Sequence, residues 1–205
     1  MKTAQRVFIA ILCVSVIGCF RSPASRFYSL MSQRDIESGS AVSSEGIQLE
    51  VASVVFPQYL NDPRIAVRTG TNEISRDEYD RWIEDPDINF RQALLEMLSQ
   101  ELKSSNVFSS DVYPGRRGVQ VLQVEVLQFD VTEDDQAVMR IRWATASDRA
   151  ALVSTPLKVS EYTAQAEHRS TEARVAALGS LLGRFAKDIS LTLSVPDESK
   201  SGKRP

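Results

Sequence analysis

The sequence predicts an α+β fold, with an antiparallel or mixed β-sheet and two main helices packed on one face in a single domain. Several segments alternate apolar and polar residues as strands do, and short turns join them. Two longer segments carry apolar residues at helical spacing. The chain has 205 residues, of which 42% are hydrophobic and 25% charged. That length and composition suit one globular domain with short extensions.

The first eighteen residues have the features of a secretory signal peptide. Lys2 and Arg6 give a basic start, and residues 7–18, VFIAILCVSVIG, are apolar except for Ser15. This run is shorter than the about 20 apolar residues that a membrane-spanning helix needs. A basic start, a short apolar run and a small residue before the cut are typical of a leader that is removed. We therefore expect residues 1–18 to be a signal peptide.

Cys19 ends the apolar run in VSVIGCFRS and could be a core thiol, half of a disulfide, a metal ligand or a point of attachment. Removal of the leader takes away Cys13, the other cysteine, so Cys19 has no partner for an internal disulfide. The single histidine, His168, lies far away in the sequence, which argues against a Cys/His metal site.

Val16-Ile17-Gly18-Cys19 resembles the lipobox of bacterial lipoprotein signals. The resemblance implies cleavage before Cys19, a diacylglyceryl group on its sulfur and a third acyl chain on its new amino group. Two or more acyl chains make a stable anchor, whereas one holds a protein only marginally. The next residue is Phe20 and not Asp, which by the sorting pattern of such lipoproteins implies the outer membrane, with the protein facing the periplasm.

The first half of the mature chain is expected to begin with a tether. Residues 19–46 are rich in Ser, Arg and Gly and form a lipidated tether and loop, with a possible short edge strand in the aromatic stretch RFYSL, residues 26–30. The α+β domain is expected at residues 47–193. Its first strand, 47–56, should end at Pro57, which cannot donate to a ladder, and a second strand should follow at 64–69.

The first helix is predicted to start at Asp85-Pro86, with Asp85 as the cap and Pro86 at the first helical position. An apolar stripe at helical spacing then predicts a buried face, formed by Phe90, Leu94, Met97, Leu98 and Leu102.

Three strands in an antiparallel meander are predicted next, at residues 119–132, 137–147 and 152–162. The apolar phase of the first strand shifts near Leu127, so either a bulge lies there or both faces are covered. Pro156 indicates that the last strand lies at an edge or carries a bulge.

A long amphipathic helix is predicted from Thr171 to about Leu193, with charged residues off its apolar stripe. Gly179 and Gly183 form a GxxxG pattern, which we attribute to close approach of the helix to the sheet, because the charges exclude a membrane span. Residues 194–205 have little to bury and are expected to be a disordered tail.

The search for chemistry favours a protein that is not an enzyme. The sequence has no GxSxG, HExxH, CxxC or phosphate-binding glycine loop, and we expect no cofactor and no metal site. His168 lies in a polar context typical of a solvated loop. The dense carboxylates of residues 75–87, including Glu84 and Asp87, could act on a sugar, but such a run is more typical of a solvated loop and a helix cap. No basic cluster suited to nucleic acid is present.

The order of motifs resembles that of the ABC-type transport auxiliary lipoproteins of the PqiC type over about residues 19–193. The lipobox cysteine is followed by the FY-x-L stretch at 27–30, then by VVFPQYLNDPRIAVRT at 54–69 and RWIEDP at 81–86, ahead of the first helix. The strand with Trp143 and the long C-terminal helix complete the pattern. Each motif is loose alone, and their order and spacing carry the resemblance.

The resemblance implies a role rather than a reaction. Proteins of this kind belong to MCE-type systems, in which an inner-membrane ABC transporter and an MCE-domain protein move lipids between two membranes. It implies an MCE-domain protein as partner, an outer-membrane attachment through acyl chains on Cys19, and a possible homo-oligomeric ring. A lipoprotein that regulates or scaffolds another envelope machine, such as cell-wall synthesis, is the alternative.

One loop carries apolar and aromatic groups that interfaces favour, namely Phe56, Pro57, Tyr59 and Leu60. If the loop projects, these residues form a possible contact with a partner or with another copy. If instead Tyr59 and Leu60 fold back onto the sheet, they belong to the core.

Overall fold

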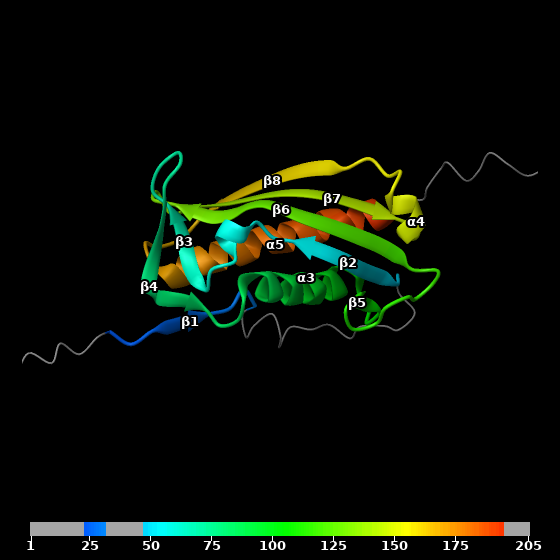
Figure 1. Ribbon diagram of the computed structural model, residues 1–205, viewed down its shortest axis with the longest axis horizontal. Coiled ribbons are helices and arrows are strands. Elements are labelled where there is room, and N and C mark those ends of the chain that lie inside the picture. The colour runs from blue at the N-terminus through cyan, green and yellow to red at the C-terminus, as the bar shows by residue number, and fades with distance from the viewer. Residues whose placement is uncertain (1–22, 32–46, 195–205) are drawn as a thin grey trace, which may run out of the picture.

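The computed structural model describes residues 23–31 and 47–194. Cys19, the leader and residues 195–205 of the predicted tail therefore lie outside the described residues, whereas Ser194 is the last residue of α5. The structure is an α+β domain with one eight-stranded mixed sheet, and α3 and α5 lie together on one of its faces (Figure 1). This confirms the predicted fold class. The strands are β1 Arg26–Tyr28, β2 Leu49–Val55, β3 Arg64–Arg68, β4 Ile74–Trp82, β5 Val107–Ser109, β6 Gln120–Thr132, β7 Gln136–Ala146 and β8 Lys158–Gln165. The helices are the 3-10 turn η1 Gln58–Leu60, α3 Pro86–Leu102, α4 Arg149–Leu152 and α5 Thr171–Ser194.

The long strand β6 is the centre of the sheet. It pairs antiparallel with β7 along most of its length, and β7 pairs antiparallel with β8. Along its other edge, β6 pairs parallel with β2 first and with β3 at its end. Beyond these, β5 adds to β2, while β4 and then β1 add to β3. The meander β6–β7–β8 is the one predicted, and β8 lies at an edge as Pro156 indicated.

The phase shift in β6 is a bulge. Its register with β7 slips between Val126 and Gln128, so one extra residue lies in the strand. The slip returns Phe129 and Val131 to the buried side on which Val124 and Val126 already lie. The bulge therefore lets one long strand keep a single core face.

Both predicted helices bury the expected stripes. In α3, Phe90, Leu94 and Leu98 are fully buried, and Met97 and Leu102 pack at the edge of the core. In α5 the buried stripe consists of Val175, Leu178, Leu182, Phe185 and Ile189. Each stripe removes several large side chains from water, which provides most of the driving force for docking a helix on a sheet.

The predicted third strand of the meander starts too early. Residues 149–152 form α4, and the strand runs over 158–165 instead of 152–162. The Asp148 carboxylate accepts a hydrogen bond from the amide of Ala151, which caps a helix turn where we expected a simple turn. Pro156 then precedes the strand and does not interrupt it.

The N-terminus of α3 also differs from the prediction. Pro86 occupies the first helical position as expected, but the Asp85 side chain makes no capping hydrogen bond. Its backbone carbonyl accepts from the amide of Asn89, and the Asn89 side chain accepts from the amide of Leu30. The helix start is therefore joined to the segment that follows β1.

Candidate functional site

The loop predicted as a partner contact follows directly from the end of β2. Pro57 stops the strand and, with φ of −65°, leads into the 3-10 turn η1. The amide of Leu60 donates to the Pro57 carbonyl at 2.9 Å, and the amide of Asn61 donates to Gln58 at 3.1 Å. Residues 57–61 therefore form a compact, hydrogen-bonded turn.

Half of the predicted contact residues turn inward. Leu60 is 6% exposed and belongs to the main core. The ring of Phe56 packs edge-on against Phe90 at 5.4 Å and against Phe129 at 6.4 Å between centroids. The alternative in which Tyr59 and Leu60 fold back is therefore met fully by Leu60 and in part by Tyr59, which is half-buried against the same core. Phe56 folds back in the same way. Whether the loop contacts a partner stays a prediction.

Tyr59 lies between the core and the solvent. Its half-buried ring has the Arg68 guanidinium and the Asp130 carboxylate near its hydroxyl, and burial, followed by the charge of Asp130, raises the pKa of Tyr59. Arg68 in turn donates to the buried Asp130 at 2.7 Å, and Gln128 donates to the other oxygen of Asp130 at 2.8 Å. A paired carboxylate therefore lies beneath the loop.

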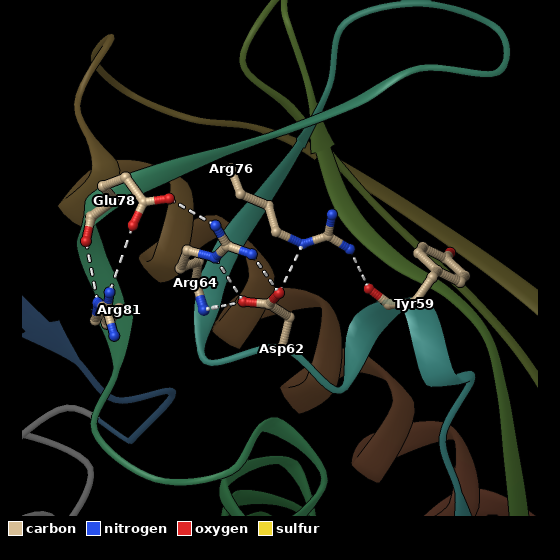
Figure 2. A network of polar contacts seen from close by, with 6 residues as sticks. All are labelled: Tyr59, Asp62, Arg64, Arg76, Glu78 and Arg81. Carbon is tan, nitrogen blue, oxygen red and sulfur yellow. Dashed lines mark hydrogen bonds and ion pairs between the residues drawn. The ribbon is translucent and has the colours of Figure 1, made fainter.

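A polar network holds the loop against β3 and β4 (Figure 2). The Asp62 carboxylate accepts from the backbone amide of Arg64 at 2.9 Å and from its guanidinium at 2.8 and 2.9 Å. Hydrogen bonds from Arg64 lower the pKa of Asp62 to about 2. Arg64 also donates to Glu78 at 2.6 Å, and Arg76 donates to the backbone carbonyl of Tyr59.

This network makes the loop a rigid surface rather than a mobile one. Arg64 of β3 bonds to the carboxylate of Asp62, the residue after the turn, and Arg76 of β4 bonds to the backbone carbonyl of Tyr59 within it. A preordered surface loses little conformational entropy when it binds. Val55 and Gln58 are exposed on this surface, and Pro57 and Tyr59 are half-buried.

The carboxylate run at 75–87 is mostly a strand and not a loop. β4 covers 74–82 and places Asp80 in a buried position, 3% exposed. Both oxygens of Asp80 are used: Arg26 donates to each, and Tyr28 and Thr171 donate one hydrogen bond apiece. An acid held in this way acts as a structural link. Glu84 is exposed and Asp87 is half-exposed at the start of α3.

His168 is exposed in the turn between β8 and α5, as predicted for a solvated loop residue. Among residues 23–31 and 47–194, no group of three or more His, Cys, Asp or Glu side chains could hold a metal ion. In the same part of the chain, no helix has the length and apolar character needed to cross a membrane.

A groove of about 380 Å³ lies between the outer sides of α3 and α5. Its lining residues are Leu30, Met97, Gln100, Glu101, Ala176, Gly179, Ser180 and Gly183. The close approach predicted from GxxxG occurs at Gly179, where a Cβ would lie 3.1 Å from the Leu30 carbonyl oxygen. The neighbour is the backbone just after β1 and not the middle of the sheet, and Gly183 has no atom within 4 Å of a built Cβ.

Comparison with known proteins gives a family and a fold. A family model described as "ABC-type transport auxiliary lipoprotein component" matches residues 28–190. A search of the curated proteins gave no match.

Two crystal structures are similar over most of both chains. One is of an uncharacterized protein, with a TM-score of 0.68 at 17% identity, over 84% of this chain and 100% of that one. The other is protein XCC0632 from Xanthomonas campestris, with a TM-score of 0.62 at 14% identity, over 81% of this chain and 93% of that one. At these identities the likeness shows a shared fold. With the family model covering most of its length, the chain belongs to the ABC-type transport auxiliary lipoprotein family.

Proposed function

We propose that this protein is an outer-membrane-anchored periplasmic lipoprotein, a non-catalytic accessory component of an MCE/ABC-type system that moves lipid between membranes. The observation that carries the proposal is membership of the auxiliary lipoprotein family over residues 28–190. The VIGC sequence at residues 16–19 supports the anchor, because it matches a lipobox directly ahead of the family region.

The anchor would hold the domain close to the bilayer. Arg26, at the start of β1, lies seven positions after Cys19. A chain advances at most about 3.5 Å per residue, so the domain would begin within roughly 25 Å of the lipidated cysteine. β1 is fixed to β4 through Asp80, so the tether ends on a folded element.

Mass spectrometry of the native protein tests the anchor. We expect a chain that begins at Cys19 and carries the mass of acyl chains. Cys19→Ser should stay with its leader uncut and should not reach the outer membrane. A native protein with a bare Cys19 thiol and an intact leader would contradict the proposed location.

Co-purification with an MCE-domain protein from the same organism tests the partner. We propose that the end of β2 and the turn after it, residues 55–61 together, are part of the contact, through Val55, Gln58 and Tyr59. Val55→Asp combined with Gln58→Glu should weaken co-purification with that protein, while Ile83→Asp, at a similarly exposed apolar residue in the β4–α3 connection, should not. Equal recovery of both variants would remove the turn from the interface.

Crosslinking in intact envelopes tests the system itself. We expect the MCE-domain protein among the partners, and crosslinks between copies of this chain if it assembles as a ring. Recovery of cell-wall synthesis proteins without any MCE-domain protein would instead favour the scaffolding role.

A further inference from the structure

Exposed apolar side chains gather at one end of the molecule. α4 and the connection between β5 and β6 lie together at the end opposite β1 (Figure 1). Four large apolar side chains there are more than half exposed: Val112 65% and Tyr113 54% in the β5–β6 connection, and Val153 92% and Leu157 60% between α4 and β8. We call these four residues the apolar tip. Large apolar side chains exposed at one end of a domain are candidates for binding another surface.

Both segments of the apolar tip pack on the same small buried cluster around Phe108. Phe108 forms a small buried cluster on which Leu152 of α4 packs. The ring of Tyr113 contacts Phe108 edge-on at 5.9 Å between centroids. α4 is also tied to the sheet by an ion pair between Arg149 and the fully buried Glu50 of β2. The tip is therefore carried by ordered elements.

Three cations lie in or next to the two segments of the tip. Arg116 stacks 4.9 Å from the centroid of Phe108 and 5.6 Å from that of Tyr113. Lys158 lies 4.8 Å from the ring centroid of Trp143. Neither cation, nor the neighbouring exposed Arg117, has a carboxylate partner within the described residues.

Two acidic groups near the tip are paired with other arginines, and a third caps α4. Asp111 pairs with Arg91, and Asp148 accepts the amide of Ala151 at the start of α4. Glu50 is buried beneath Arg149. Among the described residues, Arg116, Arg117 and Lys158 therefore place three unpaired positive charges at the tip, against the unpaired carboxylate of Asp148, in a chain whose formal net charge is −3.

We propose that the apolar tip and its cations dock on an anionic bilayer surface. Apolar side chains on loops enter the boundary between headgroups and acyl chains, and nearby Lys and Arg side chains bind lipid phosphates. Tyr113 suits this boundary because its ring is apolar and its hydroxyl stays in water. The unpaired cations supply the charge complementarity that selects an anionic bilayer.

The inference is independent of the MCE partner and of the lipid on Cys19. If the anchor is present, the two contacts lie at opposite ends of the domain, which then rests along the membrane. Two weak membrane signals together give stable attachment where one is marginal.

Vesicle co-sedimentation tests the proposal with a chain that starts at Phe20. This chain keeps every described strand and helix and lacks the anchor. We expect it to sediment with vesicles of phosphatidylglycerol and phosphatidylcholine in equal parts, to sediment less as salt rises, and to stay in solution with phosphatidylcholine alone. Absence of binding to the anionic vesicles would overturn the proposal and leave the tip to a protein partner.

Matched variants locate the contact. Each phosphate-facing cation is worth about fivefold in affinity, so Arg116→Glu with Arg117→Glu should weaken binding at least 25-fold. The control pair Arg140→Glu and Lys187→Glu makes the same change in net charge on other exposed cations that have no ion pair among the described residues, and it should bind like the unaltered chain. An equal loss of vesicle binding in both double variants would indicate general charge attraction and contradict a site at the tip.

Site-specific probes report insertion. A chain starting at Phe20 has no cysteine, so single cysteines can carry an environment-sensitive dye. We expect a blue shift with anionic vesicles at Leu157→Cys and none at Ile83→Cys, an equally exposed site elsewhere on the chain. A shift at Ile83 and not at Leu157 would place the membrane contact elsewhere and refute the inference.

Discussion

Arg26 and Asp80 are joined by two hydrogen bonds, from Nε to Oδ1 at 2.6 Å and from Nη2 to Oδ2 at 2.9 Å. Asp80 also accepts from the hydroxyls of Tyr28 and of Thr171, the first residue of α5. One buried carboxylate thus links β1, β4 and α5. Because the predicted lipid anchor lies seven positions ahead of β1, this carboxylate, with the backbone pairing of β1 and β4, would help to hold the domain to its tether.

Replacing Asp80 with Asn should lower the free energy of unfolding by about 1–3 kcal/mol, because the buried donors lose a charged acceptor. Urea denaturation at neutral pH measures this change. Asp77→Asn, at an exposed residue of the same strand, is the control and should have little effect.

The Asp80 effect should depend on pH. Burial alone would raise the pKa of Asp80, but hydrogen bonds from Thr171 and Arg26 outweigh it and hold the pKa below 3.8. A lowered pKa stabilises the fold above 3.8, and this stabilisation is lost as the pH falls further. The gap between the parent chain and Asp80→Asn should therefore be constant near neutrality and shrink in acid. A gap that widens in acid would contradict this account.

The two glycines of the GxxxG pattern should respond differently to alanine. At Gly183 a Cβ meets no atom within 4 Å, so Gly183→Ala should stabilise α5 by about 0.5–1 kcal/mol through helix propensity. At Gly179 the same Cβ lies 3.1 Å from the Leu30 carbonyl, so the backbone after β1 must shift and most of that gain is lost. Thermal unfolding of both variants measures the difference, and equal stabilisation would show that Leu30 does not restrict the helix.

The helices and the meander could be predicted because their apolar residues repeat at the period of the element. β4 could not, since its sequence ISRDEYDRW carries charged residues on both faces and only two of its nine residues are buried. It is a strand because β3 and β1 supply hydrogen bonds on either side. Pairing between distant segments leaves no periodic apolar signal in such a sequence.

The candidate sites were harder to predict for a related reason. In an alternating strand Glu50, between Leu49 and Val51, would face water, yet Glu50 is fully buried and pairs with Arg149 of α4. The four-residue α4 is too short to show a helical period. Likewise Phe56 and Leu60 have the composition of an interface, and only the position of Phe90 and Phe129 shows that they face the core.

Leu60 should behave as a core residue. Truncation to Ala leaves a cavity where a leucine was 6% exposed, and it should cost about 2–5 kcal/mol in the free energy of unfolding. Gln58→Ala, in the same 3-10 turn but exposed, should cost far less. Urea denaturation of both variants compares them. Similar costs would mean that Leu60 projects from the domain and is available to a partner.

Tyr162 should give the protein a weakness at alkaline pH. Its hydroxyl donates to Asp188 at 2.7 Å, and burial, with that hydrogen bond second, raises the pKa of Tyr162 to about 12. Between pH 10 and 12 the unfolded chain releases this proton while the folded chain keeps it, so stability falls as pH rises. Near neutrality Tyr162→Phe should be less stable by about 1 kcal/mol, because a hydrogen bond is lost.

From about pH 10 upward this difference should shrink, as urea denaturation at stepped pH would show. Asp188→Asn provides the control, because it removes the charged acceptor and leaves the ring buried. It should bring the pKa of Tyr162, measured from tyrosinate absorbance, only part of the way back toward 10. A full return would make the hydrogen bond, and not burial, the main cause of the raised pKa, and an unchanged titration would show that Asp188 has no part in it.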